Sequence, residues 1–211
     1  MSYPASFTTA NTFTQKWERG YVNHPNDPGG ATYNGVSLRF LKDRKIDING
    51  DKKIDINDIL TLYRNKDQVK VDEIFHEAFW QEPGLDRFSS VLIQTVLYDA
   101  NVNTGRTQAA KFLQRACNAI SVPGLRKLEV DGKIGPLTLS RVADLCSLDG
   151  GKKLASAYLD QRLAFHDLLV SNSPYPDGRN YRPFAAGWRN RVNDLRKYLA
   201  IIGEGARDAD A

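Results

Sequence analysis

The chain has 211 residues, of which 41% are hydrophobic and 26% are charged. This composition is typical of a folded globular protein and excludes a disordered or low-complexity chain. The longest apolar run, residues 91–98, is far shorter than the roughly 20 residues that a helix needs to cross a bilayer. The sequence starts without a basic segment followed by an apolar one, so we expect synthesis in the cytoplasm without a signal peptide.

Charge is distributed unevenly along the sequence. Subtracting Asp and Glu from Lys and Arg gives 12 − 14 = −2 for residues 1–105 and 17 − 11 = +6 for residues 106–211. The basic second half favours an anionic partner such as nucleic acid, a membrane surface or a bacterial wall polymer. By itself, the charge is explained more simply by a solvated surface.

The inventory of reactive residues excludes several kinds of catalysis. The three histidines are scattered without the spacing of a zinc site, and neither a Gly-x-Ser-x-Gly elbow nor a phosphate-binding loop is present. Cys117 and Cys146 could form a disulfide, but two cysteines in a chain without a signal peptide are more often free thiols. Catalysis by this chain would therefore depend on carboxylates.

Hydrophobic periodicity predicts a mainly helical protein. The first helix should run from Phe7 to about Arg19, and the Pro- and Gly-rich segment Tyr21–Thr32 should form a long structured loop or a short hairpin. The further predicted helices are Val36–Asp43, Ile56–Asn65, Val69–Trp80, Phe88–Ala100, Thr107–Ala119, Leu137–Leu145, Lys152–Val170 and a last one that carries Trp188, Val192, Leu195 and Leu199 on one stripe. Without an internal repeat or a clear linker, a single two-lobed domain is favoured.

Two carboxylates and a hydroxyl follow one another at the end of the first helix. Glu18 stands beside Trp17, whose ring can shield it from water and so favour a protonated carboxyl group. Asp27 follows in a rigid Pro/Gly loop, and Thr32 offers a hydroxyl that can hold water. An acid, a second carboxylate and a water-holding group suit glycoside hydrolysis. The spacing alone is also compatible with a solvated Glu at a helix end.

From Glu18 to Ser37 the chain reads Glu-Arg-Gly-Tyr-Val-Asn, then Asp-Pro-Gly-Gly-Ala-Thr, then Gly-Val-Ser. This segment resembles the signature of the glycoside hydrolase 108 family of N-acetylmuramidases, lysozyme-like enzymes of phage endolysins and bacterial cell-wall proteins, with Arg19 where Gly is usual. Residues 97–105 resemble the central helix end of that family, and residues 108–115 and 130–136 resemble its attached peptidoglycan-binding region. The resemblance spans roughly residues 7–199.

The resemblance implies a mainly α, lysozyme-like, two-lobed helical domain with a small loop or hairpin at the active site. A catalytic lobe would cover residues 1–96, with an insert at about residues 42–62. A helical lobe that resembles the peptidoglycan-binding region would cover residues 97–203, followed by a flexible tail at residues 204–211.

The resemblance also implies hydrolysis of the β-1,4 bond between N-acetylmuramic acid and N-acetylglucosamine in peptidoglycan, without a cofactor for catalysis. Glu18 would protonate the leaving oxygen. Asp27 and Thr32 would position the attacking water, as in the similar Glu/Asp/Thr arrangement of phage lysozymes, which predicts inversion. The candidate substrate-binding residues are Tyr21, Tyr33, Asp99 and Asn103, and Trp80 is a further aromatic residue that could stack on a sugar ring. Their structural alternatives are core packing for the aromatic rings and helix-end capping for the Asp and Asn.

Residues 47–58 read Asp-Ile-Asn-Gly-Asp-Lys-Lys-Ile-Asp-Ile-Asn-Asp and resemble a 12-residue EF-hand or dockerin-type calcium loop between two helical patterns. The expected ligands are Asp47, Asn49, Asp51, the backbone carbonyl of Lys53, Asp55 and Asp58. Lys52 stands where Gly usually takes a left-handed turn, and Asp58 is shorter than the usual Glu, so we expect weaker binding than at a sensor site. The prediction is a structural Ca²⁺ that braces the insert; the alternative is a solvated acidic loop.

The leading hypothesis is therefore a calcium-braced muramidase that acts as a phage endolysin, waiting in the host cytoplasm and reaching the wall after release. Its partners would be peptidoglycan glycan strands and, through the basic second half, an anionic wall or outer-membrane surface. We expect a monomer and no nucleic-acid partner, because no nucleic-acid-binding motif accompanies the charge. The alternatives are a peptidoglycan-binding protein in which Glu18 is vestigial, and a lytic transglycosylase, which needs only the Glu.

Overall fold

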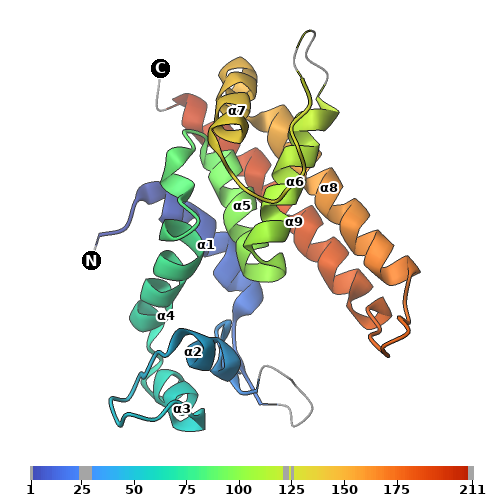
Figure 1. Ribbon diagram of the computed structural model, residues 1–211. Helices are drawn as coiled ribbons and strands as arrows, with labels where there is room; N and C mark the ends of the chain where they lie inside the picture. Colours follow the sequence, from blue (N-terminus) through green and yellow to red (C-terminus); the bar gives the residue numbers. More distant parts are fainter. Residues whose placement is uncertain (1, 24–29, 121–123, 125, 209–211) are drawn as a thin grey trace. The chain divides into compact units, whose positions relative to one another are not determined.

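The computed structural model describes residues 2–23, 30–120, 124 and 126–208, with side chains up to residue 204. This part of the chain is mainly α-helical, as predicted (Figure 1). It forms two compact units. We call Thr14–Glu82 the hairpin unit, and Met1–Phe13 together with Pro83–Ala211 the bundle unit. The units are defined by packing, so the functional division near residue 96 stays a prediction.

The hairpin unit begins with the end of helix α1 (Ala5–Glu18) and continues into a small sheet. Strands β1 (Tyr21–Val22), β2 (Thr32–Tyr33) and β3 (Val36–Ser37) pair in that order, and both described pairings are antiparallel. Tyr33 lies opposite Tyr21 on one side and opposite Val36 on the other. The two ends of the predicted loop or hairpin therefore pair as strands, and residues 24–29 between them lie outside the described residues.

The helices of the hairpin unit are α2 (Leu38–Arg44), α3 (Ile56–Asn65) and α4 (Gln68–Phe75), and α4 continues into a π-helical turn, η1 (His76–Gln81). The sequence predicts a helix from Val36, but helix α2 starts at Leu38. The reason is that the Ser37 side chain caps α2, where its hydroxyl accepts a hydrogen bond from the Phe40 N–H at 3.1 Å. The predicted helix Val69–Trp80 corresponds to α4 and η1 together.

Helix α5 (Val91–Thr104) is the core of the bundle unit, and every residue from Leu92 to Asn101 is buried. Around it pack α6 (Arg106–Ala119), α8 (Lys152–Ser171) and α9 (Ala185–Asp208) (Figure 1). The other elements of this unit are α7 (Pro136–Asp149) and the 3₁₀ turns η2 (Leu85–Arg87) and η3 (Arg182–Phe184). Helix α9 is described as far as Asp208, and the flexible tail expected at residues 204–211 stays a prediction.

No described helix combines the length and the apolar character that a membrane crossing requires.

A buried carboxylate joins α5, α8 and α9. Asp99 accepts hydrogen bonds from Arg162 Nη1 at 2.6 Å and from Arg191 Nη2 at 2.8 Å. Burial alone would raise the pKa of Asp99, but the charges and hydrogen bonds of Arg191 and Arg162 outweigh it and hold that pKa well below its ordinary value. Removing one partner from such a buried pair typically costs about 3–5 kcal/mol of stability.

Both cysteines are buried and free, as predicted. Cys117 lies on α6 and Cys146 on α7. Burial raises the pKa of the Cys117 thiol to about 12 and also raises the pKa of the Cys146 thiol. A thiol in such surroundings stays protonated and reacts slowly, since the thiolate is the reactive form.

A buried histidine lies beside the Asp99 cluster. The ring of His166 on α8 stacks on Trp188 of α9, with ring centroids 4.6 Å apart. Burial, followed by the positive charge of Arg162, lowers the pKa of His166 to about 4. Arg191 acts in the same direction, whereas the carboxylates of Asp167 and Asp99 oppose it.

We expect stability to fall as the pH decreases from about 6.5 to about 4. In this range His166 takes up a proton in the unfolded chain but stays neutral in the folded one, so protons favour unfolding. The variant His166→Phe keeps a ring against Trp188 and should flatten the plot of Tm against pH in this window, measured by calorimetry. An unaltered slope in the variant would contradict the assignment.

Candidate active site

Glu18 is the last residue of α1, and its side chain is half-buried. The Cβ and Cγ atoms of the Glu18 side chain pack against Gly35. A Cβ built on Gly35 would lie 3.0 Å from the Cβ of Glu18 and 2.7 Å from Cζ of Phe75. Any larger residue at position 35 would therefore displace Glu18 or Phe75, and the glycine allows Glu18 to sit where it does.

Asn34 and Gly35 form the turn between β2 and β3. Both have positive φ, 45° at Asn34 and 84° at Gly35, which is the pattern of a type I′ turn. An Asn-Gly dipeptide between two short strands is a strong hairpin signal in sequence. The prediction of a helix from Val36 overlooked it.

Asn34 also holds the chain just beyond Glu18. Its side-chain oxygen accepts a hydrogen bond from the Gly20 N–H at 2.8 Å, and its own N–H donates to the Gly20 carbonyl at 3.0 Å. The side-chain amide of Asn34 donates to Gln68 Oε1 on α4 at 2.9 Å. Asn34 and Gln68 therefore position the segment that leaves Glu18, and neither residue was identified from the sequence.

Of the other predicted catalytic residues, the structure describes Thr32 and not Asp27. Thr32 is half-buried on β2, and its hydroxyl donates to the Gly30 carbonyl at 3.3 Å. The Thr32 oxygen is thus oriented to accept hydrogen bonds rather than to donate them. Asp27 lies outside the described residues, so its role stays a prediction.

The predicted aromatic residues Tyr21 and Tyr33 meet a third tyrosine. Tyr63 on α3 stacks on the ring of Tyr21, with centroids 4.7 Å apart, and meets the ring of Tyr33 edge-on at 5.8 Å. Tyr33 is buried and Tyr21 is half-buried. Trp80, another sequence candidate for sugar stacking, is completely buried in the core.

Asp99 and Asn103, also predicted to bind substrate, belong to α5 in the bundle unit. Asp99 is 0% exposed, so its side chain faces arginines rather than solvent. Asn103 is half-buried and accepts a hydrogen bond from Arg162 Nη2 at 3.0 Å. The same guanidinium contacts Asp99, so Asp99 is connected to Asn103 through Arg162.

The acidic loop is closed by hydrogen bonds between its side chains and its own backbone. Asp47 accepts from the N–H groups of Gly50 at 2.7 Å and Lys52 at 2.8 Å. Lys52 has a φ of 67°, the left-handed conformation that the calcium-loop pattern requires at this position. The lysine therefore occupies a conformation that glycine adopts at lower cost, as the sequence indicated.

The last acidic residue of the loop has a structural role. Asp58 is 0% exposed and accepts hydrogen bonds from the N–H groups of Ile48 at 2.7 Å and Asp55 at 2.8 Å. Asp55 and Asp58 together form the capping box that starts α3. Within the described residues, no three His, Cys, Asp or Glu side chains are arranged to hold a metal ion. Calcium at this loop stays a prediction.

Comparison with known proteins identifies the class. Residues 11–105 match the family model described as glycosyl hydrolase 108, and residues 108–193 match a predicted peptidoglycan domain. The protein is therefore a glycosidase that acts on peptidoglycan. The segment that matches the glycosyl hydrolase 108 model contains Glu18, Thr32 and the acidic loop.

A solved structure, that of SagA from Brucella abortus, has a TM-score of 0.64 with this chain and 24% sequence identity. The alignment covers 94% of this chain and 95% of the SagA chain. This likeness shows that the two proteins share a fold over nearly their whole length. No curated protein matches the chain in sequence.

The contact between Gly35 and Glu18 predicts that Gly35→Ala lowers both stability and lysis of peptidoglycan. The added methyl group combines backbone strain with collisions at Glu18 and Phe75, and we expect a loss of about 1–3 kcal/mol. Gly178→Ala is the matched control, because Gly178 has a φ of 85° and a Cβ there would have no atom within 4 Å. Urea unfolding and turbidity clearing measure the two effects, and equal losses in both variants would contradict the prediction.

Proposed function

We propose that the protein is an N-acetylmuramidase in which Glu18 acts as the general acid. The proposal rests on the position of Glu18, half-buried at the end of α1 and packed against the Asn34–Gly35 turn, inside the segment that matches the glycosidase family. A carboxyl group that must reach one particular oxygen benefits when the start of its side chain is held in place by such packing. The reciprocal hydrogen bonds of Gly20 and Asn34 restrict the backbone that follows Glu18.

In the proposed reaction, Glu18 gives its proton to the bridging oxygen as the bond from C1 of N-acetylmuramic acid to O4 of N-acetylglucosamine breaks. A water molecule attacks C1 from the opposite face and passes a proton to Asp27, which gives inversion. The Thr32 hydroxyl supports this scheme, because its hydrogen is directed to Gly30 and its oxygen can accept a hydrogen bond from that water.

We further propose that the segment 108–193 keeps the enzyme on the wall, and that the protein acts as a monomeric endolysin after release from a host cytoplasm. The match to a predicted peptidoglycan domain supports wall attachment. The charge of +6 on residues 106–211 supports attraction to an anionic wall or outer-membrane surface.

The variant Glu18→Gln should lose at least about a hundredfold in kcat on purified peptidoglycan, because the amide has no acidic proton to give. The matched control is Glu129→Gln, which changes an exposed glutamate of the bundle unit. Release of reducing sugar ends gives the rate. Undiminished turnover by Glu18→Gln would place the acid elsewhere in the chain.

The products distinguish the mechanisms. An inverting muramidase leaves N-acetylmuramic acid at the new reducing end first as its α anomer, which nuclear magnetic resonance detects before mutarotation. Anhydro-muramic products, with activity retained in Asp27→Asn, would instead identify a lytic transglycosylase. Wall binding without any product from the wild-type chain would identify a binding protein in which Glu18 is vestigial.

We also propose that Ca²⁺ binds the loop of residues 47–58 and braces the insert. Support comes from the left-handed conformation of Lys52 and from the side-chain oxygens that already line the loop backbone. Catalysis itself would need no cofactor. The ion would offset the mutual repulsion of the loop carboxylates, so its removal should loosen the insert.

Adding Ca²⁺ should raise the Tm of the wild-type protein relative to chelator, and Asp51→Asn should reduce that difference. Asp51 suits this test because its Oδ1 accepts a hydrogen bond from the Lys53 N–H at 2.8 Å, which an asparagine oxygen can also do. The control is Asp177→Asn, since Asp177 belongs to the bundle unit and accepts from the Arg179 N–H at 3.1 Å in the same local arrangement. A wild-type protein with the same Tm in Ca²⁺ and in chelator would overturn the proposal.

A further inference from the structure

Tyr63 is an exposed aromatic residue whose ring is held in place. Its side chain is 46% exposed, although the same helix, α3, is anchored by Ile59 and Leu62, which are both 0% exposed. The ring stacks on Tyr21 with an interplanar angle of 23° and contacts Tyr33 at 65°. Among the described residues, the Tyr63 hydroxyl has no hydrogen-bond partner. The ring and the hydroxyl are therefore both available to a ligand.

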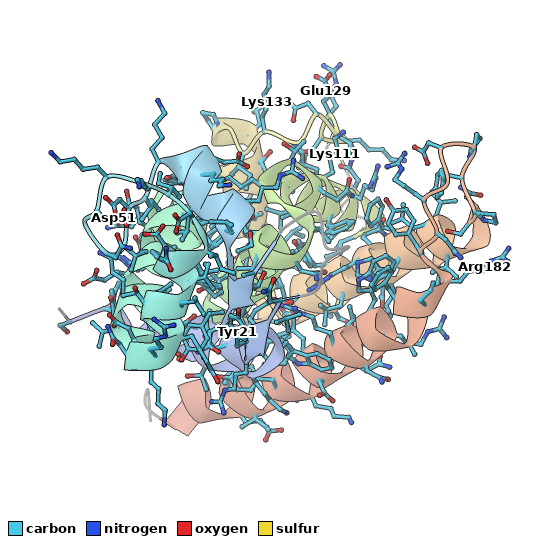
Figure 2. All side chains as sticks on the ribbon, turned by 90° about the horizontal axis from the view of Figure 1, so that it is seen from below. Tyr21, Asp51, Lys111, Glu129, Lys133 and Arg182 are labelled. Atoms are coloured by element: carbon cyan, nitrogen blue, oxygen red, sulfur yellow. The ribbon has the colours of Figure 1, made fainter. Side chains whose placement is uncertain are left out.

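This tyrosine cluster adjoins the segment that leaves the proposed catalytic acid. Tyr21 stands three positions after Glu18 on β1, directly following the Gly20 that Asn34 holds (Figure 2 labels Tyr21). Tyr33 on β2 lies opposite Tyr21 and directly precedes Asn34.

Such a surface fits a sugar ring. One face of a pyranose carries mainly C–H groups, which pack against an aromatic ring, while its edges carry the hydroxyl and acetamido groups that form hydrogen bonds. Tyrosine offers both kinds of contact, and a ring already fixed by a neighbour loses little conformational entropy on binding. A polymer of acetylated sugars therefore matches the exposed part of the Tyr63 ring and its free hydroxyl.

We propose that Tyr63, supported by Tyr21, forms a sugar-binding subsite for the glycan strand of peptidoglycan. The inference rests on the proposed muramidase function and adds a specificity-determining residue from α3, outside the Glu18–Ser37 signature. The acidic loop sets the position of this residue, because Asp55 and Asp58 start the helix that carries Tyr63. Figure 2 labels Asp51 in that loop.

The test compares Tyr63→Ala, Tyr63→Phe and Ile201→Ala on soluble glycan strands from which the peptides have been removed. Ile201 is the control, since it is 69% exposed and lies on α9 outside the segment 108–193 that we propose to bind the wall. Tyr63→Ala should raise KM about threefold to tenfold with kcat within about twofold of wild type. Tyr63→Phe should recover most of this loss, and Ile201→Ala should leave KM unchanged.

A binding measurement separates this inference from the muramidase proposal. In a Glu18→Gln background, calorimetry with a tetrasaccharide of alternating N-acetylglucosamine and N-acetylmuramic acid should show the same three- to tenfold weakening on Tyr63→Ala. Unchanged KM and Kd, in a protein whose turnover requires Glu18, would overturn the subsite and leave the muramidase standing. Turnover that survives Glu18→Gln would reject the muramidase proposal independently of Tyr63.

A further variant, Tyr63→Trp, tests the subsite even if Tyr63→Ala does not fold. Tyr63→Trp keeps a large ring in the cluster and adds an indole whose fluorescence reports its contact with solvent. The tetrasaccharide should change the emission of Tyr63→Trp by more than it changes the emission of the parent protein. An emission that the tetrasaccharide leaves unchanged, relative to the parent, would overturn the subsite.

Discussion

The backbone beyond Glu18 is held by the reciprocal hydrogen bonds between Gly20 and Asn34, and the arrangement of the candidate site depends on them. Asn34 adopts the left-handed conformation of a type I′ turn, and its side chain also reaches Gln68 on α4. The following Gly35, which has no side chain, leaves space for the Cβ and Cγ atoms of Glu18. One dipeptide thus reverses the chain, ties the sheet to a helix and orients the proposed acid.

Helices with strong local signals were predictable. The bounds of α3, Ile56–Asn65, agree with the sequence prediction because Asp55 caps the helix and the buried Ile59 and Leu62 give it a clear apolar stripe. The strand at Val36–Ser37 was missed because two residues carry no periodicity. The π-helical turn at His76–Gln81 was missed for a related reason, since apolar spacing predicts a helix without distinguishing its hydrogen-bond pattern.

Sequence reasoning could nominate the candidate site residues that follow one another in a motif, namely Glu18, Thr32 and the tyrosines of β1 and β2, whose roles stay predictions. It could not nominate contact partners that are distant in the sequence. Tyr63 comes from a helix beyond the acidic loop, and nothing in its own sequence neighbourhood indicates Tyr21 or Tyr33. Asp99 looked equally suited to a sugar cleft or a helix end, and its arginines lie 63 and 92 positions away in the chain. Only the packing of α5, α8 and α9 brings these charges together.

The two buried cysteines have a practical consequence. Cys117 and Cys146 are shielded from solvent, and burial keeps both thiols protonated near neutral pH. Neither sulfur is therefore poised for attack on a disulfide or for mild oxidation. The folded protein should keep one covalent form whether the surrounding medium is reducing or oxidising, so its handling need not depend on added reductant.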